Sequence, residues 1–338
     1  MEKLSNSRRS YKPTVIFYFT KIAFAIQLSF YKTVNLRCKS LQPNISIMKK
    51  ILLLSAAAFI IATLLSYTLK NPKPTLYNAN CYNSCFTIET KKMIELDAAK
   101  PGFTLLHPNP KKIIFNNPLG KMIQYPTSDG TNAQGYFIPS ATKSNKWLIV
   151  IQEWWGLNDN IKHEADIFYK ELGNMNVIAV DMYDGKVATV PDSAMKIMRN
   201  ADPARLENII KGAISLAGKD AKIYTVGWCF GGGWSLQASI LAGNNAAGCV
   251  MYYGRPEENI ERLKTIHCDV IGFFGNKDQG ITPDVVNRFE KNMKEAEKNM
   301  MLYRYDAGHG FANPSNPSFN KEATEDAHQK AIAFLKKH

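Results

Sequence analysis

Residues 223–238, IYTVGWCFGGGWSLQA, decide the fold class of this chain. The stretch opens with an apolar and β-branched run typical of a buried strand, passes through Gly-Trp-Cys-Phe-Gly-Gly-Gly, and continues into helix-forming residues. A cysteine between glycines at such a junction occupies the place where a nucleophile elbow carries its reactive side chain. Two interpretations follow for Cys229: a nucleophile, or a small apolar residue in a tight turn.

The rest of the chain repeats this strand-to-helix rhythm. The expected strands are two within 121–139 around the turn signal at 128–130, then 147–152, 177–183, 223–228, 249–254, 270–275 and 301–306. The expected helices are 159–172, 192–199, 203–217, 231–242, 283–297 and 319–336. Unbroken apolar runs, rather than alternation, are typical of strands buried on both faces. The sequence therefore predicts an α/β fold, a mostly parallel sheet with helices on both faces.

Three reactive side chains follow three of these strands. They are, in chain order, Cys229, Asp278 and His309. Ligands of open α/β sheets gather at the carboxyl ends of the strands. A thiol attacks as thiolate and needs a base; an imidazole can be that base near neutral pH, and a carboxylate orients the imidazole. Each residue alone has an ordinary role, as a buried thiol, a packed histidine or a turn residue, but the three in nucleophile–acid–base order favour nucleophilic catalysis.

The glycines around Cys229 fit the same interpretation. A nucleophile elbow is sharp and strained, and it leaves no room for side chains at Gly227 and Gly231. The helix expected from Gly231 directs its first N–H groups toward the thiol. These groups would lower the pKa of the thiol and offer a donor for an oxyanion.

A carboxyl and two indoles follow the strand expected at 147–152. Glu153 stands at a buried strand end and precedes Trp154 and Trp155. A carboxyl in such a partly apolar place is expected to have a raised pKa. The two indoles are compatible both with core packing and with an apolar pocket for a substrate.

Five motifs together resemble the dienelactone hydrolase family of the α/β-hydrolases, over residues 103–338. They are QEWWGLN (152–158), DMYDGK (181–186), GWCFGGG (227–233), GNKD (275–278) and AGHGFANP (307–314). The resemblance implies the α/β-hydrolase fold and a triad of Cys229, His309 and Asp278. It also implies cleavage of carboxylic esters or lactones through an acyl-enzyme.

The resemblance further assigns residues around the triad. It implies that Glu153 interacts with the resting thiol and that the backbone N–H groups of Trp154 and Phe230 form the oxyanion hole. We expect no cofactor and no metal ion. The expected partner is a small-molecule ester or lactone, and the expected assembly is a monomer.

The chain departs from the family where substrate is held. The founding enzymes bind the carboxylate of their substrate with two arginines. One follows the histidine by four positions, where this chain has Asn313; the other follows the Asp-x-Tyr segment, where this chain has Gly185 beside Lys186. Because an arginine fork binds carboxylates in a way that a lysine does not, we expect neutral esters and lactones as substrates. The residues expected to contact substrate are Trp155, Tyr183, Lys186 and Asn313.

The charge of the chain is concentrated near its beginning. The formal net charge is +13, but residues 1–70 hold 11 Lys and Arg and a single acid, Glu2. The remaining residues hold 31 basic and 28 acidic side chains. With no basic stripe to follow a phosphate backbone, the composition argues against nucleic-acid binding.

An apolar run follows the basic residues. Met48-Lys49-Lys50 precedes 17 uncharged residues, ILLLSAAAFIIATLLSY, at 51–67. A positive flank before such a run is typical of an export signal or a signal anchor, although a buried helix is an alternative. We expect an N-terminal extension at 1–47 upstream of a start at Met48, a signal peptide or membrane anchor at 48–70, a linker at 71–102 and the hydrolase-like domain at 103–338.

This organisation predicts an exported protein, periplasmic or membrane-anchored and facing outward, with a cytoplasmic location as the alternative. Membrane contact is expected only through the N-terminal apolar segment. Two other functions stay open: an exported binding protein with an idle hydrolase fold, and a thiol-redox protein that uses Cys229. Cys81 and Cys85 could form a small disulfide loop, whereas Cys249 and Cys268 are expected to be buried structural thiols.

Overall fold

The computed structural model describes residues 115–338. The expectations for the extension at 1–47, the signal or anchor at 48–70 and the linker at 71–102 lie outside these residues, as do Cys81 and Cys85. Over residues 115–338, no helix combines the length and the apolar character needed to cross a membrane.

Eight strands of the described part form one sheet in the order β1-β2-β4-β3-β5-β6-β7-β8. Their bounds are β1 Lys121–Pro126, β2 Asn132–Ile138, β3 Lys146–Ile151, β4 Asn176–Val180, β5 Lys222–Trp228, β6 Ala246–Tyr252, β7 Val270–Gly275 and β8 Met300–Tyr305. Strand β2 pairs antiparallel with both β1 and β4, and every other neighbouring pair is parallel. The expected mostly parallel sheet is confirmed.

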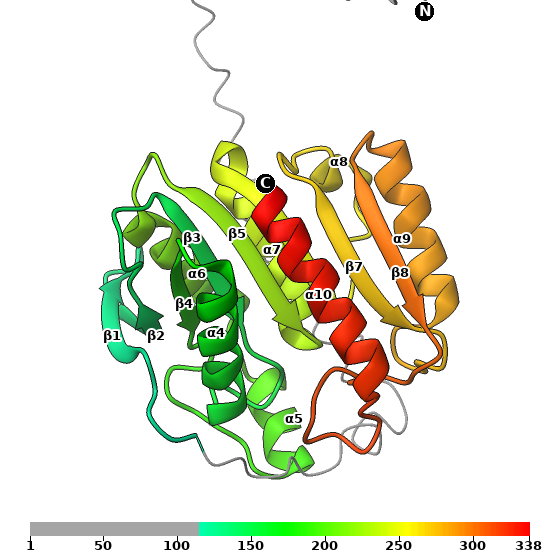
Figure 1. Ribbon diagram of the computed structural model, residues 1–338, viewed down its shortest axis with the longest axis horizontal. Coiled ribbons are helices and arrows are strands. Elements are labelled where there is room, and N and C mark those ends of the chain that lie inside the picture. Colours follow the sequence, from blue (N-terminus) through cyan, green and yellow to red (C-terminus); the bar gives the residue numbers. More distant parts are fainter. Residues whose placement is uncertain (1–114) are drawn as a thin grey trace, which may run out of the picture. The chain divides into compact units, whose positions relative to one another are not determined.

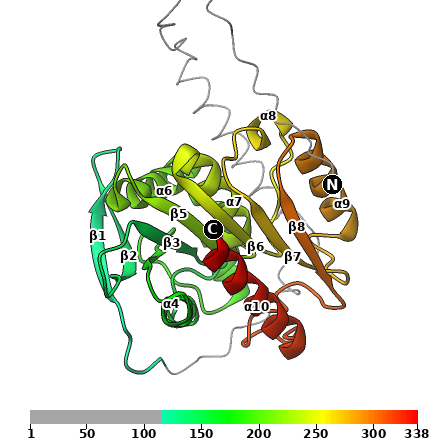
Figure 2. The same cartoon turned by 45° about the horizontal axis from the view of Figure 1, so that its top comes forward.

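Helices cover both faces of this sheet (Figure 1). Their bounds are α4 Asp159–Leu172, α5 Pro191–Arg199, α6 Pro203–Ala217, α7 Phe230–Ala242, α8 Ile260–Leu263, α9 Pro283–Glu295 and α10 Lys321–Lys337, with a 3-10 turn at Gly243–Asn245. Helices α4 and α10 pack on one face and α5 to α9 on the other. The turned view in Figure 2 shows α6, α7 and α9 across the sheet from α4 and α10.

The central strand β3 shows why the apolar runs are unbroken. Leu148 and Val150 belong to the core under α4 and α10, whereas Ile149 and Ile151 belong to the core shared with α6 and α7. Alternate side chains of a strand point to opposite faces, and here both faces are covered. Full burial of each side chain is worth about 1.5–3 kcal/mol relative to exposure, so these residues hold the sheet between its helix layers.

Some local features differ from the sequence expectation, and three of these differences have a clear physical reason. Strand β4 ends at Val180, not at 183, because Asp181 accepts hydrogen bonds from the N–H groups of Tyr183 (3.0 Å) and Gly185 (2.6 Å) and so closes a turn. Strand β6 ends at Tyr252, because Tyr253 has a left-handed φ of 36°. The short helix α8 was not expected, because four residues are too few to show a helical period.

Candidate active site

The turn at Cys229 has the geometry of a nucleophile elbow. Cys229 follows β5 directly and has a φ of 54°, which side chains other than glycine rarely adopt. A Cβ at Gly227 would lie 2.0 Å from the carbonyl oxygen of Gly231, and one at Gly231 would lie 2.3 Å from the carbonyl oxygen of Ile151. Only glycine fits at both places, so the two glycines let the strand turn sharply and hold the thiol at the sheet's edge.

Helix α7 begins immediately behind the thiol. The N–H groups of Gly232 and Gly233 donate to the carbonyl oxygen of Cys229, at 3.0 and 3.3 Å. Phe230 is the first residue of the helix, where N–H groups have no helical carbonyl to bind. The positive end of the helix dipole therefore faces Cys229 and favours the thiolate.

Asp278 and His309 meet at the carboxyl ends of β7 and β8. His309 Nδ1 lies 2.7 Å from Asp278 Oδ2, and both side chains are buried. The other carboxylate oxygen, Oδ1, accepts the backbone N–H groups of Gly280 (2.7 Å) and Ile281 (2.9 Å). With Nδ1 bound to the carboxylate, Nε2 is the ring nitrogen left to act on Cys229, whose charge and hydrogen bonding also raise the pKa of His309.

The charges of the three residues stabilise one another. Burial would lower the pKa of His309, but the attraction of the Asp278 carboxylate and of the Cys229 thiolate outweighs it and raises that pKa well above its ordinary value. Burial would raise the pKa of Asp278, yet the charge of His309 and the hydrogen bonds it accepts lower it. The arrangement therefore favours the charged imidazole and the ionised carboxylate, and the charged imidazole stabilises the thiolate once Cys229 has lost its proton.

Glu153 is held beside the triad by Asn313. Asn313 Nδ2 donates to Glu153 Oε2 at 2.6 Å. Asn313 Oδ1 accepts from the N–H (2.8 Å) and the hydroxyl (2.7 Å) of Ser315, which fixes the orientation of the amide. The side chain expected to contact substrate is thus already bonded to the carboxyl of Glu153.

The carboxyl of Glu153 titrates near neutral pH. Burial raises its pKa to about 7, against the charge of His309 and the hydrogen bonds of Asn313 and Tyr253, which lower it. The raised pKa expected from its apolar sequence context agrees with this value. At pH 7 the carboxyl is therefore close to half ionised, and it can exchange a proton with its neighbours.

Tyr253 is a site residue that sequence reasoning missed. Its ring meets that of His309 edge-to-face, with centroids 5.1 Å apart. Burial and the charges of Glu153 and Cys229 raise the pKa of its phenol well above the ordinary value. Its position could have identified it, because Tyr253 directly follows β6, where site residues of this fold lie. The expected strand runs to 254, which places Tyr253 within the strand.

The two indoles after β3 are covered by protein. Trp154 and Trp155 are buried and meet edge-to-face, with centroids 4.9 Å apart. The carbonyl oxygen of Trp155 accepts the N–H of Ala188 at 2.8 Å, which ties this turn to the loop after β4. Trp155 is only 3% exposed, so the structure offers a substrate no more than a small edge of this ring.

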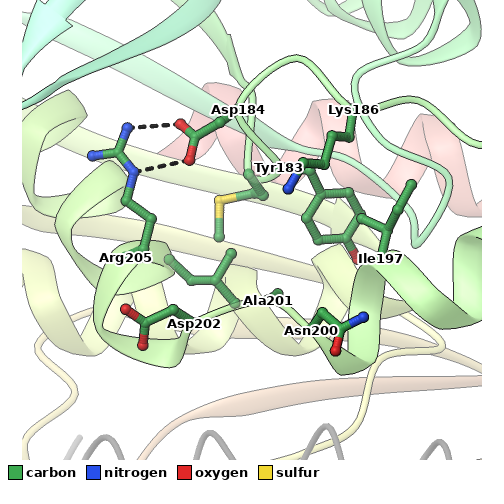
Figure 3. A pocket seen from close by; sticks show the side chains of 10 residues that line it. Tyr183, Asp184, Lys186, Ile197, Asn200, Ala201, Asp202 and Arg205 are labelled. Atoms are coloured by element: carbon green, nitrogen blue, oxygen red, sulfur yellow. Dashed lines mark hydrogen bonds and ion pairs between the residues drawn. The ribbon is translucent and has the colours of Figure 1, made fainter.

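Tyr183 and Lys186 border a cavity of about 180 Å³ between the β4–α5 loop and helices α5 and α6 (Figure 3). The ring of Tyr183 packs against that of Phe230, with centroids 5.4 Å apart. Its hydroxyl is buried and has no hydrogen-bond partner among the described residues. Burial and the charge of Cys229 raise the pKa of this phenol well above its ordinary value. Lys186 is exposed at the mouth.

Comparison with known proteins places this geometry in a family. Residues 134–338 match the sequence profile of the dienelactone hydrolase family. The chain belongs to the dienelactone hydrolase family. Its predicted enzyme class, a hydrolase of esters or lactones, is the class of that family. Within residues 115–338, no group of three or more His, Cys, Asp or Glu side chains is arranged to hold a metal ion.

Named relatives agree with this membership. A putative carboxymethylenebutenolidase of Saccharolobus solfataricus is 29% identical over 258 residues, which cover 62% of this chain and 96% of that protein. A carboxymethylenebutenolidase of Pseudomonas sp. strain P51 is 33% identical over 119 residues, 35% of this chain and 49% of that protein.

Solved structures support the fold of the dienelactone hydrolase family. A putative dienelactone hydrolase of Klebsiella pneumoniae superposes with a TM-score of 0.58 at 20% identity, and the match covers 66% of this chain and all of that one. A dienelactone hydrolase-like promiscuous phosphotriesterase from metagenomic libraries superposes with a TM-score of 0.57 at 18% identity, over 65% of this chain and 98% of that one.

Proposed function

We propose that this chain hydrolyses carboxylic esters or lactones through an acyl-enzyme on Cys229. The observation that carries the proposal is the connected set of Asp278, His309 and Cys229 at three strand ends, with the Asp278–His309 hydrogen bond at 2.7 Å. A thiol with only a packing role needs neither an imidazole nor a buried carboxylate beside it.

The reaction has two halves with balanced bonds. In the first, the thiolate of Cys229 attacks the carbonyl carbon, a carbon–sulfur bond forms, the carbon–oxygen bond to the alcohol breaks, and His309 gives the leaving oxygen its proton. In the second, His309 takes a proton from water, the hydroxide attacks the thioester, and the carbon–sulfur bond breaks to return the thiolate. The N–H groups of Phe230 and Trp154 are the proposed donors to the oxyanion.

Glu153 is proposed as a proton partner of the resting thiol. Its pKa of about 7 lets it accept the thiol proton or return it near neutral pH. Asn313 holds the carboxyl in place rather than reaching for a substrate. Because the amide of Asn313 is bonded to Glu153 and does not bind a substrate carboxylate, neutral esters or lactones are the proposed substrates.

The decisive experiment follows the release of 4-nitrophenol from a short-chain ester by the full chain. We expect a burst equal to the enzyme concentration, abolished by iodoacetamide and by Cys229→Ala. Loss of a covalent nucleophile costs several orders of magnitude in rate. Cys268→Ala is the matched control, because Cys268 is also a free thiol but lies away from the triad. A Cys229→Ala rate above about a tenth of wild type would refute the assignment, since a decade is only ~1.4 kcal/mol of barrier.

The same assay separates the other two functions. An idle fold gives no burst and no turnover, whereas a thiol-redox protein reduces a disulfide substrate without releasing nitrophenol. Within residues 115–338, Cys229, Cys249 and Cys268 form no disulfide bond. Burial raises the pKa of Cys249 and of Cys268, which makes both poor resolving thiols and favours the hydrolase.

A further inference from the structure

The cavity beside Tyr183 is not used by the triad. Its apolar wall consists of Met182, Tyr183, Ile197, Ala201 and Leu206. Tyr183 is the shared element, because its ring packs against Phe230, the residue after the nucleophile. Tyr183 therefore joins the lining of the cavity to the residue that follows Cys229.

The order of the strands tells which half of a substrate this cavity faces. Cys229 follows β5, while Asp278 and His309 follow β7 and β8, on one side of it in the sheet. Tyr183 follows β4, on the other side. The leaving oxygen has to sit beside His309 to receive its proton, so the acyl half of the substrate extends the other way, toward Tyr183.

The volume of the cavity limits the group that it can hold. An engineered cavity of about 150 Å³ in another protein binds benzene, and this one measures about 180 Å³. A single six-membered ring therefore fits. A long alkyl chain would extend past the apolar wall into solvent.

The polar groups around the cavity differ in whether they already bind other groups of the protein. Arg205 and Asp184 bind each other through two hydrogen bonds, at 3.0 and 2.7 Å (Figure 3). Asp202 caps α6 by accepting the N–H of Ala204 at 3.0 Å. Lys186 forms no ion pair with any described residue, so its ammonium can donate to an oxygen of an occupant.

We propose that this cavity is the acyl subsite of the enzyme and that it selects an aromatic acyl group. The ring lies against Tyr183, Ile197 and Ala201, and an acceptor oxygen at its far end meets Lys186. This inference rests on the proposed function, since it assigns the acyl half of the same ester.

The test compares acyl groups on a constant alcohol. Full-length enzyme is assayed with the 4-nitrophenyl esters of acetate, benzoate and octanoate. We expect the ratio of kcat/KM for benzoate over acetate to fall at least ~10-fold in Ala201→Leu, which fills the cavity. Ile197→Phe fills it from another wall and should act in the same direction. Each ratio comes from one protein sample, so a partly folded preparation does not distort it.

Ala247→Leu is the matched control, because Ala247 is also partly buried but lies near the start of β6, at the opposite end of the sheet. Its benzoate-to-acetate ratio should equal that of wild type. For Lys186, the matched substrates are the 4-methoxybenzoate and the 4-ethylbenzoate, which differ by one acceptor oxygen. Lys186→Met should reduce the preference for the methoxy ester at least ~3-fold.

Each other result overturns a defined part of the idea. An unchanged benzoate ratio in both Ala201→Leu and Ile197→Phe would show that the cavity does not hold the acyl group. If the kcat/KM of wild type is higher for the octanoate ester than for the benzoate ester, the cavity does not select a single ring. Absence of Cys229-dependent turnover for every ester would overturn the proposed function itself.

Discussion

At the scale of single residues, Asn313 sets the ionisation of Glu153. Its amide donates to the carboxyl at 2.6 Å and lowers a pKa that burial has raised to about 7. A hydrogen bond to a charged group is worth about 1.5–3 kcal/mol, or roughly 1–2 pH units. Asn313→Ala should therefore move the neutral inflection of the pH profile of kcat/KM upward, and Glu153→Gln should remove it.

Ser315→Ala is the graded control for that shift. Ser315 holds the amide of Asn313 through two hydrogen bonds and makes no contact with the triad among the described interactions. The substitution removes the hydroxyl bond and leaves the backbone N–H bond, so it should move the inflection in the same direction but by less. An inflection that stays in place in both variants would show that Glu153 does not titrate in the rate profile.

His309 and Asp278 are expected to act as one unit. The carboxylate works through the imidazole, which it orients and charges from 2.7 Å. His309→Gln should slow acylation more than Asp278→Asn, and the double variant should cost far less than the product of the two. Burst kinetics of the three variants measure this directly. If the fold losses in acylation rate of the two single variants multiply in the double variant, the two groups act independently and His309 is structural.

At the scale of elements, the elbow depends on its glycines. A Cβ at Gly227 would meet backbone at 2.0 Å, and the backbone cannot move as a flexible side chain can. Gly227→Ala should therefore lower the free energy of unfolding, measured by urea denaturation, by at least ~2 kcal/mol. It should also lower the activity. Gly308→Ala is the control, because its Cβ would have an ordinary contact of 3.5 Å. Equal losses in the two variants would contradict the close packing of the turn.

The elements also show what the sequence can predict. Buried parallel strands leave long apolar runs, so β7 was predicted at its observed bounds and β5 to within one residue. The order of reactive residues at strand ends predicted that Asp278 and His309 would meet. The ends of β4 and β6 were not predicted, because Tyr183 and Tyr253 continue the apolar pattern past the last paired residue. The partner of Asn313 could not be predicted either, since Glu153 lies 160 positions away and only the folded loop brings them together.

At the scale of the whole molecule, the N-terminal segment is proposed to direct export. The 17 uncharged residues at 51–67 behind Lys49 and Lys50 have the composition of a signal or an anchor. Cell fractionation of the natural protein should find it in the membrane or outside the cytoplasm, and N-terminal sequencing should find no residue of 1–47. A cytoplasmic protein that begins at Met1 would contradict both parts.

Glu153 should also give the stability of the whole domain a pH dependence. Its pKa is about 7 in the folded state and ordinarily 4.5, so between these values the folded protein binds more protons than the unfolded chain. Its contribution to the free energy of unfolding therefore falls as pH rises from about 4.5 through 7, by roughly 3 kcal/mol. Glu153→Gln keeps the shape but cannot ionise. Urea unfolding measures the free energy of unfolding of the variant minus that of wild type at each pH. We expect this difference to be more favourable to the variant at pH 8 than at pH 5. The contributions of the other titrating groups cancel in it, because both proteins contain them. The same difference at both pH values would show that the pKa of this carboxyl is not raised by folding.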